Sequence, residues 1–139
     1  MKLYRKNVSD RTESQICNEV DLQNKAYLYL KCTPKIIETD YKTYIDMEDL
    51  NEMCIADMYG EDIKNMPAYI LTQIHDIIVK LYLQCGIEYV DVTPYNFIEI
   101  NKKVYIIDFG DAKLVKDRNW YLQELFSNTK LHEWNSDFK

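Results

Sequence analysis

The strongest constraint on the fold is an apolar stripe between residues 67 and 86. The apolar side chains of this stripe recur at helical spacing, and they are Ile70, Ile74, Ile77, Ile78, Leu81 and Cys85. Residues spaced in this way share one face of an α-helix, and a face of this kind has to be buried in a core. We expect the helix to begin after Asn65, with Pro67 in its first turn, and to stop at Gly86.

A second long helix is predicted near the N-terminus. Thr12 and Gln15 have the spacing of a capping box, in which each side chain bonds a backbone amide at the helix start. We expect the helix to run from about residue 11 to residue 30. Its predicted apolar face consists of Ile16, Val20, Tyr27 and Leu30.

Short β-rich segments surround these helices. Residues 35–38 and 44–47 predict a hairpin around a polar turn at 39–43, and residues 1–8 can supply a third strand. A short helix is expected from residue 51 to about residue 59, closed by the glycine that follows.

Two more elements are expected in the C-terminal half. A second hairpin should pair residues 97–100 with residues 104–107 through a turn at 101–103. A further helix is predicted near residues 117–126.

These elements predict an α+β fold in a single domain, since 139 residues are too few for several domains. Hydrophobic residues make up 47% of the chain and charged residues 29%, a balance that can form a core. No apolar run approaches the roughly 20 residues of a membrane span, and the N-terminus lacks the apolar segment of a secretion signal. We therefore expect an intracellular protein without a membrane partner, in the host cytoplasm or the virion if the source is a virus.

The charge and the cysteines argue against two further classes of partner. Acidic residues outnumber basic ones by 23 to 17, which works against nucleic-acid binding. No Cys-x-x-Cys pair occurs, and two histidines are few for a zinc site. The four cysteines, which we expect to be reduced and buried as small apolar residues, are Cys17, Cys32, Cys54 and Cys85.

Three polar residues stand out by their places relative to the second predicted hairpin. Asp91 follows the long apolar helix, Asn96 begins the hairpin, and Asp108 follows its returning strand. The two ends of a hairpin lie side by side, so Asn96 and Asp108 should reach one cation, with Asp91 beside them. Carboxylate and amide oxygens suit Mg²⁺, which keeps water and substrate phosphates as its other ligands.

These residues resemble the motifs of the protein-kinase family. Residues 89–96, Tyr-Val-Asp-Val-Thr-Pro-Tyr-Asn, resemble a kinase catalytic loop, and the triplet Asp108-Phe109-Gly110 resembles the kinase metal-binding triplet. The full pattern would arise by chance in a chain of this composition with a probability on the order of one in 10⁴ to 10⁵. The resemblance implies that Asp91 is the catalytic residue and that Asn96 and Asp108 bind Mg²⁺ together with ATP.

The resemblance extends to the predicted hinge. Residues 44–50 resemble the strand that leads into the hinge between the two lobes of a kinase. The resemblance then implies that Met47 guards the adenine pocket. Backbone groups of Glu48, Asp49 and Leu50 would bind the purine.

The helix of residues 11–30 would be the mobile helix of the small lobe, with Glu19 as its ion-pairing carboxylate. The lysine partner, which holds the nucleotide phosphates in a kinase, should come from the preceding strand. Lys2 and Lys6 are both candidates. Both would point to the same face of a strand, so strand periodicity does not choose between them.

The chain also departs from the common kinase pattern. Val90 and Thr93 stand where many protein kinases have arginine and lysine, no Gly-rich loop precedes residue 60, and no Ala-Pro-Glu follows the triplet. The pattern is closer to atypical, RIO-like kinases and to compact viral or bacterial-effector kinases. It implies a reduced small lobe and hinge in residues 1–49 and a truncated, mainly helical large lobe in residues 50–139.

Two functions from different classes are compatible with these features, beside a purely structural protein such as a small virion or scaffold component. The first is a serine/threonine protein-kinase-like phosphotransferase that uses Mg-ATP. The alternative is a pseudokinase that binds a nucleotide or a protein without catalysis. In either case we expect ATP and a protein substrate or an activating protein as partners.

The aromatic tail is predicted to replace the missing helices of the large lobe. Its aromatic and apolar side chains, expected to pack on the helix of residues 67–85, are Trp120, Leu125, Phe126, Trp134 and Phe138. Alternatively, these side chains form a docking surface for a partner protein.

Overall fold

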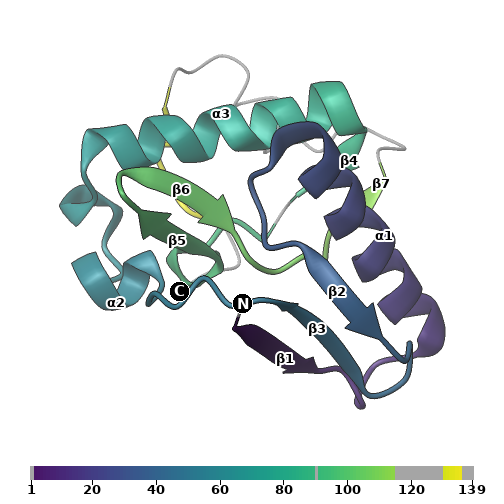
Figure 1. The fold of residues 1–139 in the computed structure, drawn as a ribbon. Helices are drawn as coiled ribbons and strands as arrows, with labels where there is room; N and C mark the ends of the chain where they lie inside the picture. Colours follow the sequence, from purple (N-terminus) through teal and green to yellow (C-terminus); the bar gives the residue numbers. More distant parts are fainter. Residues whose placement is uncertain (1, 90, 115–129, 136–139) are drawn as a thin grey trace.

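The computed structural model describes residues 2–89, 91–114 and 130–135 and shows a mixed α+β fold, as predicted. Figure 1 shows a three-stranded sheet on one side, helix α3 on the other, and helix α1 between them. The elements are β1 (Leu3–Asn7), α1 (Glu13–Leu30), β2 (Ile36–Thr39), β3 (Tyr44–Glu48), α2 (Ile55–Tyr59), η1 (Ile63–Asn65), α3 (Ala68–Cys85), β4 (Ile87–Glu88), η2 (Pro94–Asn96), β5 (Phe97–Ile100), β6 (Lys103–Ile106) and β7 (Lys113–Leu114).

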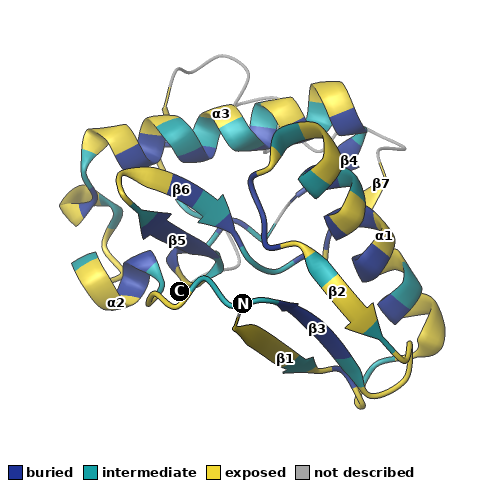
Figure 2. Cartoon of the chain, viewed as in Figure 1, coloured by how far each residue is buried: buried dark blue, intermediate teal, exposed yellow. Residues whose placement is uncertain are grey.

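The N-terminal sheet has the strand order β1-β3-β2, with both pairs antiparallel. The hairpin predicted from residues 35–47 and the third strand predicted from residues 1–8 are therefore confirmed. The middle strand β3 is largely buried, whereas its two neighbours are largely exposed (Figure 2). The buried part of the sheet is therefore its middle strand, β3.

Helix α1 connects the two hydrophobic cores. The Thr12 side chain accepts a bond from the Gln15 amide and Gln15 caps Thr12 in return, which confirms the capping box and starts the helix at Glu13. Residues on one side of the helix pack with the sheet, and residues on another side join the core around α3. The first group is Ile16 and Val20, and the second is Leu22 and Ala26.

The predicted apolar face of α1 is buried at Ile16 and Val20. Tyr27 and Leu30 are only partly buried, and Leu30 packs against the core around α3. The helix faces two cores rather than one, so its buried surface is wider than a single stripe and takes in positions between the predicted ones.

Helix α3 is the centre of the larger core and ends at Gly86, which has the left-handed φ of 65° that favours glycine at this position. Pro67 is the residue that caps the helix, not a member of its first turn as predicted. Ile77 is only partly buried, and Leu71 is buried in addition to the other predicted residues.

The second predicted hairpin is present as β5 and β6, and it lies beside α3. Its turn contains two residues, Asn101 and Lys102, both with positive φ, so β6 begins one residue earlier than predicted. The Ile106 amide donates to the Cys32 carbonyl at 2.8 Å, which ties this hairpin to the segment between α1 and β2.

The short helix α2 begins at Ile55, four residues later than predicted. Asn51 has a φ of 57°, which is incompatible with the first turn of a right-handed helix. Gly60 closes the helix with a φ of 87°, at the predicted end. The residues between Glu48 and the helix therefore form an irregular segment.

All four cysteines are free thiols, as expected. Cys32 and Cys85 are buried, whereas Cys17 and Cys54 are partly exposed, so the prediction of burial was wrong for half of them. Burial raises the pKa of the Cys32 thiol to about 12. This thiol is therefore protonated at neutral pH.

The last described segment, residues 130–135, covers part of the larger core. Leu131 is buried, and its amide donates to the Leu71 carbonyl at 3.2 Å. Trp134 packs against the same core, and its indole donates to the Glu61 carbonyl at 2.8 Å. The predicted helix of residues 117–126 lies outside the described residues, as do Val90, Trp120, Leu125, Phe126 and Phe138.

The tail contact leads to a stability prediction. Leu131→Ala should lower the free energy of unfolding by about 2 to 4 kcal/mol, because it removes a fully buried side chain and leaves a cavity. Leu83→Ala is the matched control, since Leu83 is 70% exposed and should change stability by less than about 0.5 kcal/mol. Urea unfolding followed by tryptophan fluorescence measures both. Equal midpoints for the two variants would show that the tail does not belong to the core.

Among the described residues, no helix combines the length and apolar character that crossing a membrane requires.

Candidate active site

A cleft of about 410 Å³ lies between the N-terminal sheet and the segments that follow α3. Strands β1 and β3 contribute residues from one side, and η2, β5 and the segment after β6 contribute from the other. Seven predicted site residues line the cleft. Met47 and Leu50, with the acidic Glu48 and Asp49 between them, lie in the part that we call its apolar end, and Lys6, Asn96 and Asp108 in the part that we call its polar end.

Three predicted site residues do not line the cleft. Glu19 lies on α1 behind Lys6, and Asp91 lies beside Asn96. The side chain of Lys2 is exposed, and its carbonyl accepts a bond from the Asp49 amide at 3.0 Å. The sequence left open whether Lys2 or Lys6 is the ion-pair partner of Glu19. In the structure, the partner is Lys6.

Lys6 is the centre of the polar end. Its Nζ atom lies 2.5 Å from Glu19 Oε2 and 3.1 Å from Asp108 Oδ1. Burial alone would lower the pKa of Lys6, but the charge of Asp108 and the hydrogen bond and charge of Glu19 outweigh it, so the pKa is raised. Lys6 is thus a permanent cation held between two carboxylates.

Glu19 is the more deeply buried of these two carboxylates, with a side chain only 1% exposed. Arg11 is its second cationic neighbour, with Nε at 4.0 Å from Oε1. A carboxylate at such a depth is costly unless it is paired. Pairing with Lys6 and Arg11 therefore explains how α1 can hold the buried carboxylate of Glu19.

Asp108 is fixed by a tight turn at the triplet. Its Oδ1 atom also accepts a bond from the Gly110 amide at 2.7 Å. A Cβ atom on Gly110 would lie 3.0 Å from this oxygen, so glycine allows the turn to close. Arg11 donates to the Gly110 carbonyl at 2.6 Å.

Arg11 is a site residue that sequence analysis missed. It is 99 positions from Gly110 in the chain, and no motif connects the two residues. Its position just before the capping box of α1 is the only sequence signal, because that box fixes the loop that carries it.

Asp91 and Asn96 form one hydrogen-bonded unit. The Asn96 Nδ2 atom donates to the Asp91 carbonyl at 2.8 Å and to Asp91 Oδ2 at 3.0 Å. Burial and the charges of Asp111 and Asp108 raise the pKa of Asp91, and the bond from Asn96 opposes the rise. The result is a carboxylate that is more basic than an ordinary aspartate.

The hairpin places this unit next to Asp108. The Ile107 amide donates to the Asn96 carbonyl at 3.0 Å, so the residue before Asp108 is bonded to the residue that starts the hairpin. This is the side-by-side arrangement of strand ends on which the sequence argument depended.

Three buried aromatic rings pack with one another next to Asp91, Asn96 and Asp108. Tyr89 packs edge to face with Phe109, with ring centroids 5.6 Å apart, and with Phe97 at 6.3 Å. All three rings are fully buried. They connect the start of the loop, the hairpin and the triplet, so movement of one would displace the others.

At the apolar end, Met47 is buried, and its sulfur lies 3.6 Å from the Gln23 amide nitrogen. Glu48, Asp49 and Leu50, whose backbone groups are predicted to bind a purine, follow Met47 along the chain. The amides of Glu48 and Asp49 already donate to carbonyls of the protein, each at 3.0 Å. Of the three backbone amides, that of Leu50 is the one for which no bond is found among the described residues.

The side-chain oxygens at the polar end can supply some, but not all, of the ligands of a Mg²⁺ ion. Asn96 uses its Nδ2 atom for Asp91, which leaves its carbonyl oxygen as the ligand atom, and Asp108 contributes a carboxylate. No group of three or more His, Cys, Asp or Glu side chains is gathered for a metal in residues 2–89, 91–114 and 130–135. A hard cation here would need oxygens from water and phosphate, as Mg²⁺ commonly has.

No protein-family model matches the sequence, and no curated protein matches it. Among solved structures, the complex of Rv3197 with erythromycin from Mycobacterium tuberculosis is similar, with a TM-score of 0.55 and 20% sequence identity. The match covers 69% of this chain but only 26% of that chain. It therefore shows a shared fold over part of a larger protein, and nothing about what this chain binds.

Proposed function

We propose that the chain is an ATP-dependent phosphotransferase with a protein-kinase-like fold, acting with Mg-ATP on serine or threonine hydroxyls of a protein. One observation carries the proposal. Lys6 bonds both Glu19 and Asp108 at the end of a cleft that Asn96 also lines. In protein kinases, a strand lysine, a helix glutamate and the aspartate of the Asp-Phe-Gly triplet must all be in place for phosphoryl transfer.

The order of the elements supports the same reading. The lysine strand β1 is followed by the glutamate helix α1, a hairpin, the segment around Leu50, helix α3, and then the loop and triplet with the acidic residues. In the proposal, residues 1–49 correspond to a reduced small lobe and hinge and residues 50–139 to a truncated large lobe. An intracellular location would suit the proposed use of ATP.

The two ends of the cleft would receive different parts of the nucleotide. Met47 and the Leu50 backbone would contact the base at the apolar end. Lys6 would neutralise phosphate charge at the polar end, where its position is fixed by Glu19. Asn96 and Asp108 would hold Mg²⁺, which supplies charge neutralisation for the phosphates when bound.

Asp91 would act on the acceptor hydroxyl rather than on the metal. Its carboxylate is oriented by Asn96, and its raised pKa favours accepting a proton. In this role Asp91 would hold the hydroxyl in position and take its proton as the hydroxyl oxygen bonds to the terminal phosphorus, while the bond from that phosphorus to the bridging oxygen breaks and ADP leaves. Phosphoryl transfer depends mostly on the positioning of the reactants and on neutralising phosphate charge. A lysine, two metal ligands and one carboxylate base would therefore be sufficient for the reaction.

The second candidate is a pseudokinase that binds a nucleotide or a protein partner without transfer. It is favoured by the absence of any glycine before Gly60, because the flexible loop that covers the phosphates in kinases is rich in glycine. Catalytic turnover separates the two candidates, since both can bind Mg-ATP.

The Mg²⁺ ligands provide the test of the shared part of the proposal. Asn96→Ala and Asp108→Ala should each lower the affinity for ATP in the presence of Mg²⁺ by at least 10-fold, because each removes a ligand atom next to the phosphates. Asp111→Ala is the matched control, since Asp111 is an exposed aspartate close in sequence that does not line the cleft. Calorimetric titration measures all three. Equal affinities in the three variants would exclude the proposed metal site.

A further inference from the structure

Strand β1 presents an aromatic ring to the cleft beside Lys6. Alternate residues of a strand point to the same face, and Tyr4 and Lys6 both line the cleft. Tyr4 is paired with Met47 on β3, so the ring lies at the apolar end. Although it lines a cleft, Tyr4 is 52% exposed, and no hydrogen bond to its hydroxyl is found among the described residues.

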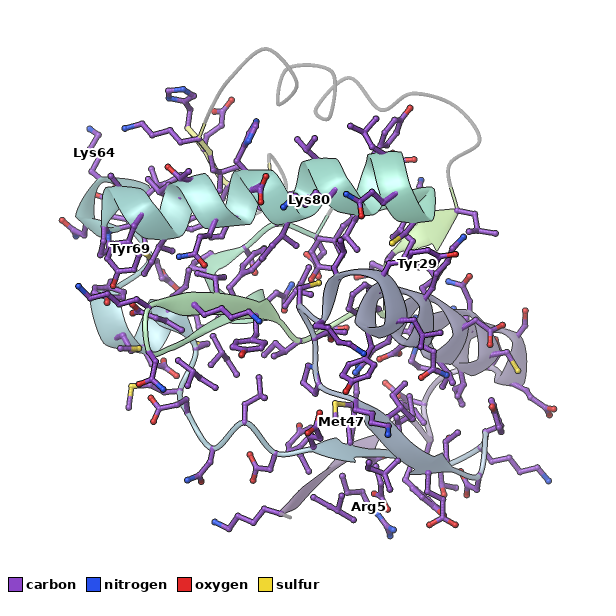
Figure 3. The ribbon with its side chains drawn as sticks, turned by 45° about the horizontal axis from the view of Figure 1, so that its top comes forward. Arg5, Tyr29, Met47, Lys64, Tyr69 and Lys80 are labelled. Carbon is purple, nitrogen blue, oxygen red and sulfur yellow. The ribbon has the colours of Figure 1, made fainter. Side chains whose placement is uncertain are left out.

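The opposite face of β1 holds the strand in this orientation. Arg5 forms a bidentate ion pair with Asp46, at 2.7 Å and 2.8 Å, and its guanidinium lies 3.9 Å from the centroid of the Tyr44 ring. Arg5 and Met47 lie on opposite sides of the sheet (Figure 3). With Arg5 fixed on one side, the neighbouring Tyr4 is directed to the other, toward the cleft.

We propose that Tyr4 stacks on the purine base of the nucleotide and forms one wall of the base site. This inference rests on the proposed function, because Lys6 marks the end of the cleft where phosphates would lie. Tyr4 is two residues away on the same face, a displacement of about 7 Å along the strand toward Met47. The base therefore reaches Tyr4 when the phosphates reach Lys6.

Two side chains on the opposite wall of the cleft offer apolar surface to a flat ligand. Ile98 on β5 and Ile107 after β6 line the cleft from the other side, so a base beneath Tyr4 would have apolar surface on both faces. An aromatic ring with two rotatable side-chain bonds loses little conformational freedom when it stacks. Stacking of Tyr4 would also cover the nucleotide in a chain with no glycine near this strand.

The proposal is tested with two variants of Tyr4 and two ligands. Tyr4→Leu keeps an apolar side chain but removes the ring, and Tyr4→Phe keeps the ring. Calorimetry should show that Tyr4→Leu binds Mg-ATP about 10-fold more weakly than the wild type, whereas Tyr4→Phe stays within about twofold. Both variants should bind Mg-tripolyphosphate, which has no base, as the wild type does. Tyr29→Leu, on an exposed tyrosine of α1, is the control for unspecific effects.

The outcomes separate this inference from the proposed function. If the wild type binds Mg-ATP and Tyr4→Leu binds it equally tightly, the stacking role is overturned. The proposed function would still stand. An equal loss of Mg-ATP and Mg-tripolyphosphate binding in Tyr4→Leu would also overturn it, because the ring would then act on the phosphates or on the fold. A wild type that binds neither ligand would overturn both proposals.

Discussion

Asp91→Asn is expected to lower the rate of phosphoryl transfer by about 10²- to 10⁴-fold while leaving the affinity for Mg-ATP near that of the wild type. The substituted amide keeps an oxygen that can accept the Asn96 bond, so the loop should retain its shape. It cannot take a proton from an acceptor hydroxyl. Asp91 does not line the cleft, which is why binding should survive.

Transfer of label from γ-labelled ATP to the protein itself and to acidic and basic acceptor proteins measures this effect. Asp21→Asn is the control, since it removes an exposed carboxylate of α1 that does not line the cleft and should keep full activity. Equal labelling by the wild type and Asp91→Asn would mean that Asp91 is only a turn residue. No labelling by the wild type, with Mg-ATP bound, would favour the pseudokinase.

Lys6→Met should both destabilise the protein and abolish nucleotide binding. Glu19 would lose its closest cation while remaining buried, and removing one member of a buried ion pair costs about 3 to 5 kcal/mol. Arg11 stays within 4.0 Å of Glu19, so we expect a loss near the lower end, about 3 kcal/mol. Urea unfolding gives the stability, and calorimetry with Mg-ATP gives the binding.

The double variant Lys6→Met/Glu19→Met separates the two effects. Apolar residues of similar volume can replace a buried ion pair with little change in stability, so the double variant should recover most of the lost stability. It should still fail to bind Mg-ATP, because the cation is gone. Recovery of binding together with stability would show that Lys6 serves the fold and not a ligand.

Much of the fold was predictable from the sequence because its signals are local. The capping box of Thr12 and Gln15, the stripe of α3 and the stop at Gly86 each involve residues within one or a few turns. The nearness of Asn96 to the triplet was predictable for the same reason, since a hairpin joins them.

Contacts between distant segments were not predictable. The choice of Lys6 over Lys2 depends on which lysine lies within β1 and meets Glu19 of α1, and sequence periodicity treats both lysines alike. Arg11 reaches Gly110 only because the fold brings the loop before α1 to the triplet. The burial of Leu22 and Ala26 outside the predicted stripe of α1 likewise results from packing against two cores.

The most direct test of the central claim is a calorimetric titration of the wild-type protein with ATP, with and without Mg²⁺. A cleft that combines Lys6, Asn96 and Asp108 should bind ATP more tightly when Mg²⁺ is present, because the metal neutralises phosphate charge next to Asp108. We expect saturable binding at one site that strengthens on adding Mg²⁺ and weakens on adding EDTA. The absence of any binding at millimolar ATP with Mg²⁺ would contradict the account.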